Sequence, residues 1–185
     1  MGVNRAIVLT AGASERLGSP KALVEVEGQT LVELVCRKLQ QANLEVTVVT
    51  RASLEGLIQD LLPYVQVVVN PQPELGRTGT IQCGIQAIGI GPVLIAPVDR
   101  PGFSLETVNS LRKSKTTITP TYEGRGGHPI AITSEDCEII LQAEADTPLR
   151  DLINPARMEV EDSHLHLNID TEEDIEQLIM VAKNL

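Results

Sequence analysis

The sequence IVLTAGASERLGSPK, residues 7–21, is the stretch from which the rest of the chain can be interpreted. It opens within the apolar run Ala6-Ile7-Val8-Leu9, which predicts a buried strand. A loop with Gly12 follows, and glycine lets backbone N–H groups approach a phosphate because no Cβ intervenes. Arg16 and Lys21 add two cations that can bind a polyphosphate. The spacing matches neither a P-loop nor a dinucleotide motif, and by itself it also fits a surface loop with two solvated cations.

Composition limits what this chain can be. It has 185 residues, of which 42% are hydrophobic and 2% are aromatic. That length and apolar content predict a single domain over residues 1–185 with an aliphatic core. The formal net charge of −10 argues against a nucleic-acid polymer as partner, because such a partner requires basic patches. It is compatible with a nucleotide held by a few local cations and Mg²⁺.

Cysteine usage and hydropathy exclude further classes. Cys36, Cys83 and Cys137 are far apart and form no Cys-x-x-Cys pair, so neither a zinc site nor a disulfide framework is expected. The N-terminal residues lack the basic-then-apolar pattern of a signal peptide, and no apolar run is long enough to span a membrane. We therefore expect a cytoplasmic protein without a membrane partner.

Strand and helix patterns alternate through the first two thirds of the chain. Buried strands are predicted at residues 6–9, 46–50, 65–69 and 92–98, and amphipathic helices follow them at residues 30–42, 54–62, after Gly79, and from Ser104 to about Lys113. This alternation is typical of βαβ units with a parallel sheet. The remainder is less regular, with strands expected at 116–120, 130–132, 157–161 and 165–169, and helices at 135–143, 147–153 and after Thr171.

Four polar features are candidates for carrying the chemistry. Asp99 follows a buried strand, and parallel sheets bind ligands beyond the carboxyl ends of their strands, although a structural turn before Pro101 also explains an aspartate here. Asp170 precedes a helix cap and could be a second metal ligand beside Asp99, or could contact only the helix N-terminus. Gly76–Thr80 opens a helix, where N–H groups favour anions, although flexibility also explains its composition. His128 follows two glycines, and a lone histidine of this kind is more often structural than catalytic.

In chain order, these segments resemble the MobA-like nucleotidyltransferases, and among them the molybdenum cofactor cytidylyltransferase (MocA-like) branch most closely. Residues 9–23 are similar to the family signature Leu-x-Ala-Gly-x-Ser-x-Arg-Met-Gly-x-x-Lys. Shorter matches are Gly76–Thr80, Val98–Pro101, Gly127-His128-Pro129 and Asn168–Asp174. Leu17 replaces the family's Met, Glu172 replaces Pro, and Asn168 replaces the first Asp of the closing motif.

The resemblance implies a Rossmann-like, three-layer α/β fold of the GT-A-like nucleotidyltransferase type, with a mostly parallel central sheet. It implies Mg²⁺-dependent transfer of NMP from an NTP to a phosphorylated acceptor, with release of pyrophosphate. CTP and the molybdopterin cofactor are the expected substrates. The alternatives are a molybdopterin guanylyltransferase, a sugar- or alditol-phosphate nucleotidyltransferase, and a non-catalytic nucleotide- or cofactor-binding maturation factor. A molybdoenzyme or a second copy of the chain is the protein partner that the resemblance suggests.

The resemblance also implies roles for individual residues. Arg16, Lys21 and Asp99 would be catalytic, and Asp99 with Asp170 would hold Mg²⁺, with Asn168 as the other candidate for the second ligand. His128 would lie on the acceptor side. The nucleotide would be bound by Leu9, Ala11, Gly12, Ala13, Ser14, Lys21, Gly79 and Thr80. Neither the base nor the acceptor is fixed by these residues.

Overall fold

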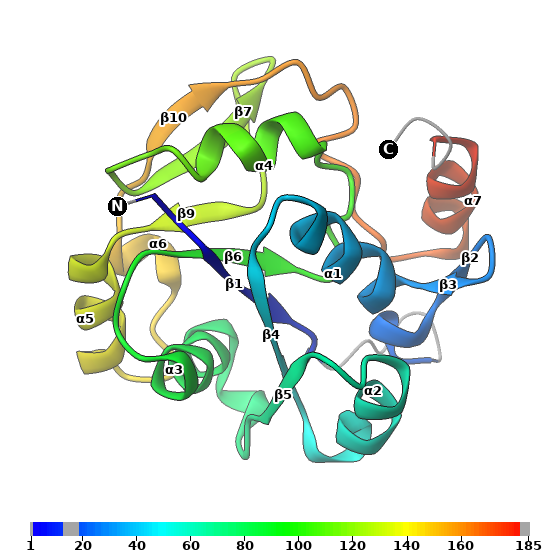
Figure 1. The fold of residues 1–185 in the computed structure, drawn as a ribbon, viewed down its shortest axis with the longest axis horizontal. Helices are drawn as coiled ribbons and strands as arrows, with labels where there is room; N and C mark the ends of the chain where they lie inside the picture. The colour runs from blue at the N-terminus through cyan, green and yellow to red at the C-terminus, as the bar shows by residue number, and fades with distance from the viewer. Residues whose placement is uncertain (1, 13–18, 182–185) are drawn as a thin grey trace.

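The computed structural model describes residues 2–12 and 19–181, which form a twisted sheet covered by helices on both faces (Figure 1). The sheet contains β1 (Arg5–Leu9), β4 (Glu45–Thr50), β5 (Gln66–Val69), β6 (Val93–Pro97), β7 (Ile118–Tyr122), β8 (Arg125–Gly126), β9 (Ile130–Ile132) and β10 (Ala156–Glu159). The helices are α1 (Leu31–Gln41), α2 (Glu55–Leu61), α3 (Arg77–Ile88), α4 (Leu105–Leu111), α5 (Ser134–Gln142), α6 (Leu149–Leu152) and α7 (Glu172–Val181). A short hairpin of β2 (Glu25–Val26) and β3 (Gln29–Thr30) precedes α1.

The strands are arranged in the order β10-β7-β9-β6-β1-β4-β5, with β8 paired to β7. β1 runs parallel to both β4 and β6, β4 is parallel to β5, and β10 is parallel to β7. β9 is antiparallel to its neighbours β6 and β7. The register places Leu9 beside Val49 on one side and Pro97 on the other, so these three strands end at one edge. The predicted mostly parallel α/β sheet is confirmed.

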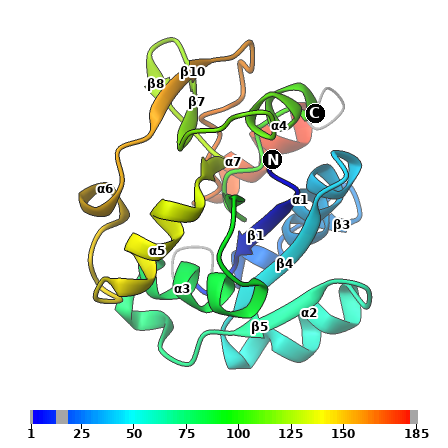
Figure 2. The ribbon, with the colours of Figure 1, turned by 60° about the vertical axis from the view of Figure 1, so that its left-hand side comes forward.

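Alternate residues of the strands point to opposite faces of the sheet, and each face has its own apolar layer. Ala6 and Val8 of β1 belong to a cluster with residues of α1, α2, α4 and α7. Ile7 and Leu9 belong to the other cluster, with residues of α3, α5 and α6. The result is the three-layer arrangement that the sequence indicated, and α3 and α5 are seen together on their face in Figure 2.

The start of α1 follows from a local sequence signal. Thr30 Oγ1 accepts the N–H of Glu33, and the Glu33 carboxylate accepts the N–H of Thr30 at 2.8 Å, which completes the predicted capping box. The helix then buries an apolar stripe that includes Leu31, Val35 and Leu39. In α3, the absence of a side chain at Gly84 lets the helix pack on β1, because a Cβ there would lie 2.8 Å from Ile7.

The prediction of a strand at residues 165–169 is wrong. Leu165 and Ile169 are buried, as the pattern indicated, but the backbone forms a turn and a loop. The N–H of Leu165 donates to Asp162 O at 3.0 Å, and the N–H of Ile169 donates to Asp99 O at 2.9 Å. These two backbone N–H groups are therefore not available to pair with a neighbouring strand. Their bonds bring this segment against the residue that follows β6.

Within the described ranges, none of the helices combines the length and the apolar character needed to cross a membrane.

Candidate active site

A cavity of about 310 Å³ opens at the carboxyl edge shared by β1 and β6 and extends to the start of α3. Its lining is mixed, with apolar groups at its walls and charged groups of both signs. The residues that line it are Leu9, Thr10, Gly12, Lys21, Pro73, Gly76, Arg77, Thr80, Pro97, Val98 and Asp99. The location is the one expected for ligands in open α/β sheets.

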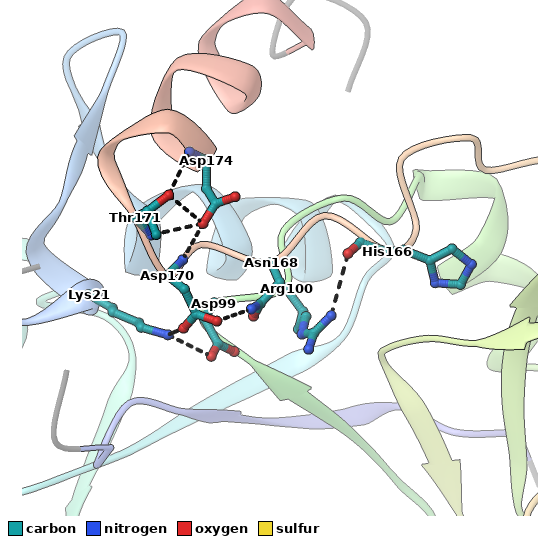
Figure 3. A network of polar contacts seen from close by, with 8 residues as sticks. All are labelled: Lys21, Asp99, Arg100, His166, Asn168, Asp170, Thr171 and Asp174. Atoms are coloured by element: carbon teal, nitrogen blue, oxygen red, sulfur yellow. Dashed lines mark hydrogen bonds and ion pairs between the residues drawn. The ribbon is translucent and has the colours of Figure 1, made fainter. Parts of the chain in front are cut away.

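Three predicted site residues meet at this edge. Lys21 Nζ lies 3.1 Å from Asp99 Oδ2 and 2.5 Å from Asp170 Oδ1, between the two carboxylates (Figure 3). The three side chains are 15%, 23% and 30% exposed, so their charges interact more strongly than on an open surface. The structure thus brings together residues that are 78 and 149 positions apart in the chain.

The two carboxylates are held in place by the backbone around them. Asp99 follows the end of β6, and its carbonyl accepts the N–H of Ile169 at 2.9 Å. The N–H groups of Asp170 and Thr171 donate to Asp174 Oδ2 at 2.9 and 2.8 Å, which fixes the start of α7 (Figure 3). The backbone N–H of Asp170, followed by that of Thr171, lowers the pKa of the Asp174 carboxyl. The Asn168 amide contacts the second oxygen of Asp170.

This pair of carboxylates suits a hard divalent cation. Mg²⁺ is usually held by one or two carboxylates together with substrate phosphates. The described residues contain no group of three or more His, Cys, Asp or Glu side chains that could hold a metal by themselves. Asp99 and Asp170 therefore fit a metal ion that shares its coordination with phosphate oxygens. Asn168 bonds to Asp170, so its place is beside the second ligand.

His128 lies at the entry to β9, next to the edge where β6 ends. Its Nδ1 is buried and has no hydrogen-bond partner among the described residues. Burial, followed by the charges of Arg77 and Arg100 and opposed by Asp99, lowers the pKa of His128 to about 4. The imidazole is therefore neutral at neutral pH, and it can exchange hydrogen bonds without carrying charge.

Arg77 and Arg100 are site residues that sequence reasoning missed. Arg77 is the first residue of α3 and lines the cavity, and Arg100 follows Asp99 directly. No carboxylate pairs with either guanidinium in the part of the chain that the structure describes. Both arginines belong to motifs that the sequence analysis quoted. Their positions in the chain do not indicate that their charges act on His128.

Some of the nucleotide-binding residues expected from the sequence line the cavity, and others do not. Leu9, Gly12 and Thr80 line the cavity, whereas Ala11 is buried next to it. The N–H of Gly79 donates to Ala145 O at 3.0 Å, so this glycine packs against the loop before α6. Three further residues named from the sequence lie outside the described residues: Ala13, Ser14 and Arg16.

Comparison with known proteins gives a family match and relatives that carry two different names. Residues 6–163 match the family model for the MobA-like NTP transferase domain. A probable molybdenum cofactor guanylyltransferase from Bacillus cytotoxicus is 28% identical over 125 residues, which cover 64% of this chain and 62% of the relative. The chain thus spans about 62% of that relative's length. A nicotine blue oxidoreductase from Paenarthrobacter nicotinovorans is 36% identical over 141 residues, covering 68% of this chain and 69% of the relative.

Solved structures share the fold. Rv0371c from Mycobacterium tuberculosis H37Rv superposes with a TM-score of 0.82 at 19% identity and covers 97% of this chain and 100% of that one. A complex of the same protein with manganese gives a TM-score of 0.79 at 16% identity, with coverage of 97% and 99%.

Proposed function

Because the chain belongs to the MobA-like NTP transferase family, we propose that its 185 residues act as one nucleotidyltransferase domain. In the proposed reaction, an oxygen of an acceptor phosphate attacks the α-phosphorus of an NTP. A new P–O bond forms, the bond between the α-phosphorus and the α–β bridging oxygen breaks, and pyrophosphate leaves with the electron pair. The expected acceptor is a molybdopterin-type phosphomonoester.

The observation that carries this proposal is the contact of Lys21 with both Asp99 and Asp170 at the open edge of the sheet. Nucleotidyl transfer needs no protein nucleophile, because the reacting groups need only in-line positioning and neutralisation of developing charge. The Lys21 ammonium supplies a cation for phosphate oxygens. The two carboxylates beside it supply oxygen ligands for a divalent cation. Lys21 would contact the transferred and leaving phosphates, and the backbone at Gly12 would lie beside them.

Asp99 and Asp170 would hold the divalent cation that the family implies, which is Mg²⁺ in our expectation. When bound, such an ion neutralises charge on phosphate oxygens and orients them for displacement. The manganese complex of the mycobacterial neighbour agrees with a divalent metal of this kind.

The acceptor side is built from groups that suit an anion. Arg77 and Arg100 place two positive charges near His128, and none of the described carboxylates offsets those charges through an ion pair. His128, neutral at neutral pH, would bond to the acceptor without adding to that charge. A phosphorylated acceptor would satisfy both guanidinium groups.

Two nucleotide donors, CTP and GTP, are each supported by a different observation. The sequence motifs resemble the cytidylyltransferase branch, which favours CTP. The curated relative from Bacillus cytotoxicus is named a guanylyltransferase, which favours GTP. We therefore treat CTP and GTP as the two donors to be compared directly.

A second candidate function is an oxidoreductase, and one observation favours it. The relative with 36% identity is named an oxidoreductase. An oxidoreductase would transfer electrons and would not release pyrophosphate from any NTP. A non-catalytic maturation factor would bind nucleotide with neither reaction.

The test is a matrix of pyrophosphate-release assays with each of the four NTPs, Mg²⁺ or Mn²⁺, and molybdopterin. The variants are Asp99→Asn and Lys21→Met, with exposed Asp60→Asn and Lys115→Met as matched controls. Loss of one charge-stabilising group should lower the rate about 10²–10³-fold, while both controls keep wild-type rates. Nucleotide binding without release under every condition would favour the maturation factor, and electron transfer between an added donor and acceptor without pyrophosphate release would favour the oxidoreductase.

A further inference from the structure

The apolar stripe of α1 contains a lysine. Lys38 follows Leu34 by four residues and Val35 by three, so it lies on the helix face that packs against the sheet. Only 4% of Lys38 is exposed. A buried lysine in a helix stripe costs desolvation free energy unless its ammonium is fully hydrogen-bonded.

The ammonium of Lys38 reaches the loop that follows β6. Its Nζ donates to the carbonyls of Pro101 at 2.9 Å and of Phe103 at 3.1 Å, and it lies 5.3 Å from the centre of the Phe103 ring. Burial lowers the pKa of Lys38 to about 8, and the nearby Asp162 carboxylate opposes that shift. The side chain therefore keeps most of its charge at neutral pH, and its bonds to the two carbonyls are charge-assisted.

The loop that Lys38 contacts runs from the end of β6 at Pro97 to the start of α4 at Leu105, and it contains the metal-side residue Asp99. The loop makes other long-range hydrogen bonds along its length: Val98 N–H to Leu9 O, Lys21 Nζ to Asp99 Oδ2, Ile169 N–H to Asp99 O, Arg100 Nη1 to His166 O and Ser104 N–H to Asp162 Oδ2. Between Arg100 and Ser104, the backbone carbonyls of Pro101 and Phe103 accept hydrogen bonds from Lys38 Nζ.

We propose that Lys38 is a positioning residue that sets the Asp99 carboxylate for metal binding through its bonds to the Pro101 and Phe103 carbonyls. This inference rests on the proposed function, since it assumes that Asp99 is a metal ligand. Lys38 touches neither substrate nor metal. Its removal leaves two carbonyls without their donor, and the loop relaxes to satisfy them elsewhere. The Asp99 carboxylate then moves relative to Asp170.

The test measures Mn²⁺ binding directly, by the electron paramagnetic resonance signal of free Mn²⁺ in the presence of CTP or GTP. Lys38→Met keeps the length and apolar contacts of the side chain and removes its donors. Loss of a group that orients a ligand weakens metal binding about 10- to 100-fold, and we expect a loss in that range. Turnover at saturating Mn²⁺ should return to within about threefold of wild type, because the reacting groups are intact. The exposed Lys115→Met variant should bind Mn²⁺ as wild type does.

Two outcomes separate this inference from the proposed function. If Asp99→Asn abolishes Mn²⁺ binding while Lys38→Met leaves it unchanged, the positioning role is refuted and the metal site stands. If Asp99→Asn leaves Mn²⁺ binding unchanged, the metal site itself is refuted, and the role of Lys38 falls with it. Should Lys38→Met not fold, as judged by circular dichroism, Lys38→Gln replaces it. Gln keeps one amide donor on a shorter chain, and the same direction of change is expected.

Discussion

Acidification should destabilise this protein through His128, and the size of the effect follows from its surroundings. The pKa of His128 is lowered from 6.5 to about 4 by burial and then by the charges of Arg77 and Arg100. The unfolded chain therefore binds a proton at this position before the folded chain does. Stability is unaffected by this group above pH 6.5 and falls as the pH drops from 6.5 towards 4. The full difference corresponds to about 3 kcal/mol, of which about 2 kcal/mol has been lost by pH 5.

The assay is urea unfolding at a series of pH values between 7.5 and 4.5 for the wild type and for His128→Gln. The free energy of unfolding of the wild type should fall more steeply with acid than that of the variant, by about 2 kcal/mol between pH 7 and pH 5. His164→Gln serves as the control histidine and should follow the wild type. Parallel curves for His128→Gln and the wild type would refute the assignment of His128 as a neutral, partly buried group beside two arginines.

Three further changes test the packing and the site. Gly84→Ala should destabilise the fold by about 1–3 kcal/mol, because its Cβ would lie 2.8 Å from Ile7, whereas Gly56→Ala, with open space around it, should be neutral or stabilising in the same urea titrations. Thr30→Ala should cost about 1 kcal/mol in urea unfolding by removing the cap of α1, and an unchanged midpoint would contradict the capping box. Asp170→Asn should raise the Mn²⁺ concentration needed for half-maximal pyrophosphate release, and an unchanged requirement would exclude Asp170 as a ligand.

Much of the fold could be predicted because its signals are local. Apolar runs such as Ala6–Leu9 identify strands that are buried on both faces, and the Thr30 capping box identifies a helix start. The segment 165–169 could not be assigned in this way. Its apolar residues are buried as in a strand, but the partner of Ile169 N–H is the carbonyl of Asp99, some 70 residues earlier. Spacing along a chain predicts which residues are buried and not which distant group pairs with them.

In the site, too, local signals could be predicted and contacts between distant residues could not. Asp99 could be expected at this edge, since it follows a parallel strand. Lys21 and Asp170 are linked to it by the family resemblance. Asp170 reaches Lys21 from a loop and not from the end of a predicted strand. The effect of Arg77 on His128 could not be predicted, because one residue opens α3 and the other precedes β9. Lys38 lies within the predicted helix 30–42, and its hydrogen bonds to Pro101 and Phe103 span 63 and 65 positions in the chain, which a local pattern cannot indicate.

The most direct test of the proposed function is the rate of pyrophosphate release by the wild type and by Asp99→Asn, measured with Mg²⁺, molybdopterin, and either CTP or GTP. We expect release with one of the two nucleotides, dependent on both metal and acceptor, and a loss of about 10²–10³-fold in the variant. Equal pyrophosphate release by the wild type and by Asp99→Asn would contradict a transfer reaction centred on Lys21, Asp99 and Asp170.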